Sequence, residues 1–214
     1  MINMPTKGSH YLLTDREESQ ITLTGYLYLC LNVKKITGVR FVGGGYTVYI
    51  TNCEEEEESK VVVNQANYLI NNGYAQILGG TSSINVEVDK IMSADQSIDR
   101  EGSYVFYNTI MRPIREGTDY LINSQIARDI VISNVSIANY SLAEGKRLIN
   151  IALTGDNRET VKIIKTKVEN VKTTNQTIFY FNRGAVLYKD NEVENVEAGH
   201  SIVWATEYGG RKHL

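Results

Sequence analysis

The clearest hydrophobic pattern in the chain runs from Ile21 to Val33. Aliphatic residues occupy every second position of this segment, with Gly25 as the one gap, and Thr, Tyr, Cys and Asn occupy the positions between them. A period of two predicts a β-strand, because the apolar positions of an amphipathic helix recur about every 3.6 residues. A single strand of this extent would be about 40 Å long, roughly twice the usual length.

A second alternating segment covers 39–51 and contains three consecutive glycines at 43–45. The glycines indicate either a loop between two strands or a bulge that bends one long strand. We therefore predict a long N-terminal strand or hairpin over about 21–51. The five consecutive glutamates at 54–58 are typical of a solvated loop, and they lack the spaced ligands and the glycine of a calcium-binding loop.

The segment 61–78 has an ambiguous pattern. Apolar residues recur at spacings of three and four, as in a helix, but Asn71-Asn72-Gly73 interrupts them. Asn-Gly is also a strong hairpin signal. The pattern predicts a short helix or a turn that ends near Gly73.

The second half of the chain is a series of short apolar segments separated by turn residues. The predicted strands are 104–114, 130–137, 148–153, 161–168, 177–181, 185–188 and 201–206. Short strands at this spacing with few helices favour a sandwich or barrel. The polar segment 95–102 is a candidate boundary. It divides the chain into an N-terminal β domain, 1–100, and a C-terminal β-sandwich-like domain, 101–214, unless both belong to one continuous domain.

One short repeat occurs in the second half. The tetrapeptide Val-Glu-Asn-Val at 168–171 recurs at 193–196, and each copy precedes an aromatic-rich strand. Because a solenoid or propeller is expected to show at least three copies, we interpret the two copies as similar strand entries in one sheet. The predicted fold is all-β, mainly an antiparallel sandwich or barrel in one or two domains, with at most one or two short helices.

Charge and composition narrow the function classes. The net charge is −3 and basic and acidic residues are mixed, whereas nucleic-acid binding needs clustered Lys and Arg. No apolar segment approaches the roughly 20 residues that span a bilayer, and residues 1–10 lack the apolar region of a signal peptide. We expect no nucleic-acid partner, no membrane span and synthesis in a cytoplasm without export.

The sequence contains no recognisable catalytic, metal-binding or cofactor-binding motif, and we expect none of these sites. Its three histidines and two cysteines lack the spacing of zinc ligands. His200 is the one candidate for nucleophile–histidine chemistry and is interpreted as a surface or packing residue, while His10 and His213 lie near the ends. Cys30 and Cys53 are interpreted as small apolar strand residues, with a disulfide between them left open.

Two further features of the sequence leave other functions open. Glycoside hydrolysis uses two carboxylates that can come from anywhere in a fold. The loop carboxylates are Asp95, Asp99, Glu101, Asp119, Asp129 and Glu144. They leave a glycosidase- or lyase-type enzyme as a minor alternative.

Tyrosine offers a candidate interaction surface. The chain has 14 tyrosines against one tryptophan and four phenylalanines. Tyr26 and Tyr28 share the face opposite the aliphatic residues of 21–33, and Tyr46 and Tyr49 lie on opposite faces of the next segment. Such side chains can stack on sugars, contact a neighbouring subunit, or form the second packed face of a sheet.

In composition the chain resembles bacteriophage virion proteins of the tail, neck or ring, and head-decoration types. The resemblance lies in Asn- and Tyr-rich strands, scarce proline, no export signal and no catalytic motif. It extends over the whole chain without a motif match, so it carries over no functional residue. It implies an oligomeric β protein located in the virion.

The leading hypothesis is a non-enzymatic structural subunit that forms a homo-oligomer through its sheet edges and contacts other virion proteins. A strand too long for a small domain supports this hypothesis, because a neighbouring subunit would cover its unpaired edge. A carbohydrate- or surface-binding β module is the first alternative, with glycans as partners.

Overall fold

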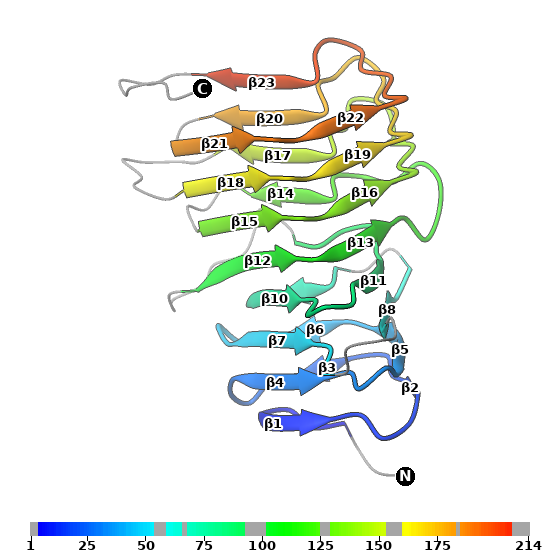
Figure 1. Ribbon diagram of the computed structural model, residues 1–214, viewed down its shortest axis with the longest axis vertical. Helices are drawn as coiled ribbons and strands as arrows, with labels where there is room; N and C mark the ends of the chain where they lie inside the picture. The colour runs from blue at the N-terminus through cyan, green and yellow to red at the C-terminus, as the bar shows by residue number, and fades with distance from the viewer. Residues whose placement is uncertain are drawn as a thin grey trace.

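The strands of this protein pair in parallel. A computed structural model describes residues 4–53, 59–65, 68–92, 102–124, 129–152, 160–182 and 185–206. Within these ranges the regular structure consists of 23 strands and no helix, and every strand pair is parallel. The chain winds through eight coils that stack along one axis, with its two ends at opposite ends of the stack (Figure 1). This arrangement is a parallel β-solenoid.

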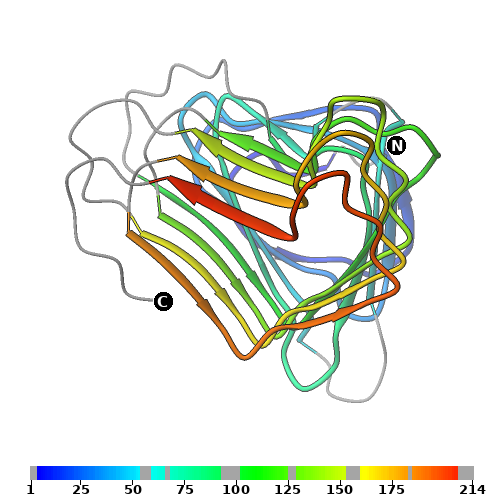
Figure 2. The same ribbon diagram turned by 90° about the horizontal axis from the view of Figure 1, so that it is seen from above.

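Each coil has three sides around a common interior (Figure 2). Sides 1 and 2 each carry one eight-stranded sheet. Side 1 consists of β1 Gly8–Tyr11, β4 Leu27–Cys30, β7 Thr47–Thr51, β10 Tyr74–Leu78, β12 Ser103–Tyr107, β15 Asp129–Ser133, β18 Thr160–Ile164 and β21 Ala185–Lys189. Side 2 consists of β2 Arg16–Glu17, β5 Lys35–Val39, β8 Ser59–Val63, β11 Ile84–Glu87, β13 Thr109–Arg112, β16 Ser136–Ala138, β19 Lys167–Glu169 and β22 Glu192–Glu194.

Side 3 carries two shorter sheets. The N-terminal coils contribute β3 Ile21–Thr22, β6 Phe41–Val42 and β9 Ile70–Asn71. The C-terminal coils contribute β14 Ile122–Ser124, β17 Ile149–Ala152, β20 Phe179–Asn182 and β23 Val203–Thr206. The segment 90–92 joins them, because Lys90 pairs with Tyr68 and Met92 pairs with Ile122.

Inward side chains form continuous rows through the stack. Alternate residues of a strand point inward, and in-register pairing places them above one another in successive coils. The row on side 3 is Ile21, Phe41, Ile70, Met92, Ile122, Ile149, Phe179 and Val203. One row on side 1 is Leu29, Ile50, Ile77, Phe106, Ile132, Ile163 and Tyr188. The row on side 2 is Ile36, Val61, Val86, Met111, Ile137, Val168 and Val193. All are buried except the members in the last coil.

Residues in the left-handed backbone region form the corners. Between sides 1 and 2 the residues with positive φ are Asn32, Val33, Asn108, Asn134, Lys165 and Asp190. At the end of side 2 they are Asn139, Asn170 and Asn195. Asparagine suits these corners because it tolerates this conformation and its amide can hydrogen-bond. The Asn170 amide donates to Asn139 Oδ1 at 3.2 Å, and the Asn134 amide donates to Asn108 Oδ1 at 3.3 Å, so the corners are linked from coil to coil.

The predicted antiparallel sandwich or barrel is wrong, although the all-β content is confirmed. Consecutive strands of the chain lie on different sides of a coil, and each strand pairs with a strand one coil away. Apolar and polar residues alternate in both architectures, because in both the strands have one face in the core and one in solvent. The alternation therefore identifies strands and inward faces but does not determine the direction of pairing.

The predicted long strand and hairpin over 21–51 are also wrong. Residues 21–33 form β3 and β4 on different sides, and a turn follows in which Asn32 and Val33 have φ values of 50° and 61°. The buried aliphatic residues are Ile21, Leu23, Leu27, Leu29 and Leu31. The alternation persists across the corner because the whole coil keeps one face toward the interior. Strands β4 and β7, the expected arms of the hairpin, pair in parallel.

The other predicted elements have mixed outcomes. Glycines 43–45 form the loop between β6 and β7, and Gly43 faces Gly73 of the next coil so closely that a Cβ on Gly43 would lie 2.4 Å from Gly73 Cα. The segment expected as a short helix or turn near Gly73 contains β9, a turn and β10. The predicted strands 104–114, 130–137 and 161–168 are each divided in two by Asn108, Asn134 or Lys165.

The two halves of the chain share the same sheets. Strand β10 pairs with β12, and β11 pairs with β13, across residue 100. The glutamates 54–58 and residues 95–101 of the candidate boundary lie outside the described residues.

The Val-Glu-Asn-Val repeat marks one corner of the solenoid. Its two copies lie on β19 and β22, which are neighbours in one sheet as interpreted. The preceding coil has Asn139 at the same position within Ile-Ala-Asn-Tyr, 137–140, so a third, divergent copy exists.

Candidate interaction surfaces

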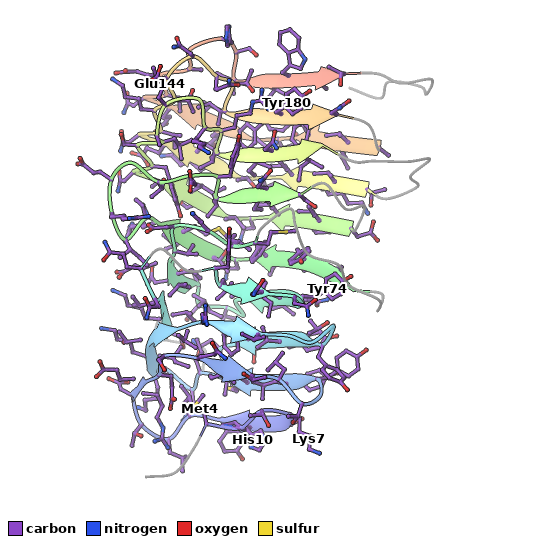
Figure 3. The ribbon with its side chains drawn as sticks, turned by 180° about the vertical axis from the view of Figure 1, so that it is seen from behind. Met4, Lys7, His10, Tyr74, Glu144 and Tyr180 are labelled. Carbon is purple, nitrogen blue, oxygen red and sulfur yellow. A yellow bond between two sulfur atoms is a disulfide. The ribbon has the colours of Figure 1, made fainter. Side chains whose placement is uncertain are left out.

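The histidines considered for catalysis lie far apart. His10 is in β1, at the N-terminal end of the stack, where its Nε2 lies 2.8 Å from the Lys7 carbonyl oxygen (Figure 3). His200 is in the loop before β23, where its backbone N–H donates to the Gln176 carbonyl at 3.2 Å. His213 lies outside the described residues. Among the described residues no group of three or more His, Cys, Asp or Glu side chains could hold a metal ion.

The loop carboxylates that the structure describes have separate partners. Asp119 forms ion pairs with Lys90 at 2.6 Å and Lys146 at 3.3 Å, and the hydrogen bond from Lys90 is the main reason that its pKa is lowered. Asp129 accepts hydrogen bonds from the backbone N–H and the hydroxyl of Thr160 at 2.9 and 3.0 Å. Glu144 is exposed, and Asp95, Asp99 and Glu101 lie outside the described residues. These contacts are typical of structural carboxylates rather than of a catalytic pair.

Cys30 and Cys53 form a disulfide, with their Cα atoms 5.9 Å apart. Cys30 ends β4, and Cys53 follows β7, so the bond links the second coil to the third. The interpretation of both as small apolar strand residues is wrong, because Cys53 is exposed and lies outside the strand. Their separation of 23 residues brings them to neighbouring positions because it corresponds to about one turn of the solenoid.

The structure brings together all four tyrosines of the candidate interaction surface. Tyr28 and Tyr49 hold the same outward position in β4 and β7, and their rings stack with centroids 4.4 Å apart. Tyr26 and Tyr46 precede these strands, and their rings meet edge to face at 5.5 Å. We call these four residues the tyrosine cluster. Tyr26 and Tyr28 remain 42% and 46% exposed, so the cluster forms an aromatic patch on side 1.

The surroundings of Tyr49 in the tyrosine cluster raise the pKa of its phenol. Burial raises the pKa of Tyr49, and the neighbouring Tyr28 raises it further by charge repulsion and by a side-chain hydrogen bond. A hydrogen bond from Thr47 acts in the opposite direction. The neutral phenol of Tyr49 is therefore the stable state at physiological pH.

The last coil leaves the apolar interior partly uncovered. Its inward residues Val186, Tyr188, Val193 and Val203 are only half-buried, although the residues beneath them in the seventh coil are fully buried. Strands β21, β22 and β23 are each last in their sheets, so within the described part of the chain one edge of each strand is unpaired. Such edges beside half-buried apolar side chains form a surface that favours strand addition.

The first coil ends the stack differently. Its inward positions on sides 1 and 2 are taken by Gly8, His10 and Arg16, which lie against Leu27, Leu29 and Ile36 of the second coil, whereas Ile21 on side 3 is apolar and buried. Met4, at the same end of the molecule, is buried (Figure 3). The polar residues at these positions of sides 1 and 2 suit a solvent-exposed end of a repeat protein. The two ends of the solenoid therefore have different chemistry.

No family model, no curated protein and no solved structure matches this chain. No helix that could cross a membrane occurs in the ranges that the structure describes. The geometry of the solenoid and its surfaces therefore has to indicate the function.

The sequence named the four tyrosines as a candidate surface, although it placed Tyr46 and Tyr49 on opposite faces, and it did not indicate the C-terminal surface. This surface includes Val186, Val193 and Val203, and the sequence around each of them resembles that of any other strand. They differ from other inward residues only by lying in the last described coil. The repeat at 168–171 and 193–196 was the available signal, because it aligns the last two coils.

Proposed function

We propose that the protein is a non-enzymatic structural subunit that associates with a second copy of itself through its last coil. One observation carries this proposal: within the described residues, the rows of inward apolar residues continue to the last coil and finish on half-buried side chains beside three strand edges that no described strand pairs with. Covering them would remove apolar surface from water and satisfy backbone groups at the edges.

The chemistry of the two ends favours contact between two C-terminal coils. Stacking a C-terminal coil on the N-terminal coil of another copy would place Val193 over Arg16 and Tyr188 over His10. Burying a charged or polar group against apolar residues costs free energy unless it is paired. When two C-terminal coils stack on each other, apolar side chains contact apolar side chains. A two-fold axis then relates the two copies and closes the assembly as a dimer.

A bacteriophage virion is the proposed location of this subunit. The support for this location is the resemblance in composition together with an elongated, repetitive β architecture whose end surface suits assembly. Mass spectrometry of purified phage particles from the source culture tests it. We expect peptides of this chain in the particle fraction, and their absence would remove the virion location without affecting self-association.

Size-exclusion chromatography with light scattering tests self-association. We expect a mass of about twice 24.1 kDa. Val193→Lys puts a charge into the end surface and should give a monomer that retains its β-sheet circular dichroism. His10→Lys is the matched control, because it puts the same charge into the inward row at the other end, and it should remain a dimer.

Two outcomes would overturn the proposal. One is a monomeric wild-type protein at every soluble concentration. The other is loss of the dimer on deletion of 207–214, because contact would then depend on residues beyond the last described coil. Retention of the dimer in this deletion variant supports contact through β21, β22 and β23.

A further inference from the structure

A row of amide and aromatic side chains runs up the outer face of side 3. Asn123, Asn150, Tyr180 and Trp204 occupy the same register position in β14, β17, β20 and β23. Tyr180 lies near the C-terminal end of the stack (Figure 3). Trp204 is 51% exposed although it is the largest side-chain type in the chain. We call this row, together with Arg147, the Arg147 strip.

Arg147 is held firmly within the strip. Its Nε donates to Gln176 Oε1 at 2.7 Å, and its Nη1 donates to Asn150 Oδ1 at 2.8 Å. Its guanidinium carbon lies 4.0 Å from the centroid of the Tyr180 ring. The Asn150 amide donates in turn to Asn123 Oδ1 at 2.7 Å, so the hydrogen bonds continue into the next coil. A guanidinium fixed in this way loses little conformational entropy on binding a ligand.

The charge of Arg147 is not balanced by a carboxylate among its contacts in the described residues. Its hydrogen-bond acceptors there are two amide oxygens, and its third contact is an aromatic ring. Lys146, the preceding residue, pairs with Asp119, which also pairs with Lys90, so Asp119 is already shared between two lysines. A guanidinium has five N–H donors, and the two hydrogen bonds to described residues leave three that no described residue accepts.

We propose that the Arg147 strip binds a carboxylated glycan. The free N–H donors of Arg147 match a sugar carboxylate in a bidentate geometry. The exposed indole of Trp204 offers an apolar ring face, on which the C–H face of a sugar ring can stack. Asn123, which is half-buried, adds an amide group for a hydroxyl along the same line, while the buried Asn150 holds Arg147 and Asn123 in place. The strip is linear, so it suits an extended chain of sugars rather than a compact ligand.

The fluorescence of Trp204 reports on this site directly, because the chain contains no other tryptophan. The probe is alginate, a polymer of uronic acids, with dextran as the neutral control and dextran sulfate as the control for anions without carboxylates. We expect alginate to shift the Trp204 emission and protect it from acrylamide quenching. Affinity should fall as salt is raised, because screening weakens the ionic contact.

Three variants separate recognition from folding. Arg147→Gln should weaken alginate binding about tenfold or more, as measured by biolayer interferometry, and Arg147→Lys should weaken it as well, because Lys lacks the planar fork. Trp204→Ala should also weaken binding. Arg40→Gln is the matched control, because Arg40 Nε likewise donates to an amide oxygen, Gln20 Oε1, at 2.9 Å in the N-terminal coils.

Alginate binding that the Arg147 and Trp204 variants lose and Arg40→Gln retains supports the proposal. Three outcomes overturn it: no response to alginate, equal affinity for dextran or dextran sulfate, and equal loss in Arg40→Gln. The inference is independent of self-association, because a monomeric Val193→Lys protein retains the strip and should still bind alginate.

Discussion

The rings of Tyr28 and Tyr49 lie parallel, with 5° between their planes, because the two residues occupy the same outward position in successive coils. Stacked aromatic pairs contribute about 0.5–1.5 kcal/mol beyond the area they bury. Tyr49→Leu should therefore lower the free energy of unfolding by about 1 kcal/mol in urea denaturation. Thr51→Ala, at the next outward position of β7, is the control and should change it by less. Equal effects would show that the stack does not form in solution.

The alternation of β12 gives a stringent test of the register. Phe106 points into the interior and is fully buried, whereas its neighbour Tyr107 points outward and is 46% exposed. Phe106→Ala should cost about 3–5 kcal/mol of unfolding free energy, because it leaves a cavity in a packed row. Tyr107→Ala should cost about 1 kcal/mol or less, since it empties no interior space. The reverse order would mean that the strand is shifted by one residue.

The corner at Asn170 predicts an unusual ranking of substitutions. Its φ is 53°, and its amide donates to Asn139 Oδ1. Asn170→Ala loses the hydrogen bond and adds left-handed backbone strain, which together cost about 2 kcal/mol. Asn170→Gly loses the hydrogen bond without that strain. Chemical denaturation should therefore rank glycine above alanine in stability, and alanine above glycine would contradict the corner geometry.

The Cys30–Cys53 disulfide should stabilise the N-terminal coils. A bond that closes a loop of about this length typically contributes about 3 kcal/mol by restricting the unfolded chain. The double variant Cys30→Ser, Cys53→Ser should melt at a lower temperature than the oxidised wild type. Adding dithiothreitol should lower the melting temperature of the wild type and leave that of the variant unchanged. A wild-type melting temperature that ignores the reductant would contradict the disulfide.

Stability should fall at alkaline pH because of buried tyrosines. Burial raises the pKa of Tyr140 well above 10.0, with Asp89 adding to the shift, and burial also raises the pKa of Tyr188. A group whose pKa is raised in the folded state stabilises the fold below its unfolded pKa and loses that contribution as pH rises. The melting temperature should therefore decrease as pH rises above about 10.

Tyr140→Phe serves as the control for this pH dependence. The variant should be less stable at neutral pH, because the hydroxyl donates to the Val88 carbonyl oxygen at 2.8 Å. Its melting temperature should decline less steeply above pH 10, since the titrating group is gone. An equally steep decline in both proteins would assign the alkaline loss to other residues.

The sequence pattern predicts the local features of this fold better than its topology. The apolar alternation correctly marks Ile21, Leu27 and Leu29 as inward residues, because burial on one face leaves a period of two whatever the strand pairs with. It does not show that the chain turns at Asn32, because the inward face continues around the corner.

The structural repeat is hard to recognise in the sequence because the coils differ in length. The paired residues Gly8 and Leu27 are 19 positions apart, whereas Ile130 and Val161 are 31 apart. Loops of different lengths lie between the strands, so no constant period appears in the sequence. The tyrosine cluster was found because its members lie on neighbouring segments. The Arg147 strip was not found, because Asn123 and Trp204 meet on one face only after several coils are stacked.

The stability of each coil in the solenoid comes from its contacts with adjacent coils. Each coil is held by the coils directly before and after it, so loss of order at one position spreads along the axis rather than through a shared globular centre. The first and the final coils each have a neighbour on one side alone within the described chain, and the final coil, whose inward apolar side chains are only half-buried, is the place where we expect unravelling to begin. A partner that binds the final coil should therefore also stabilise the coils beneath it.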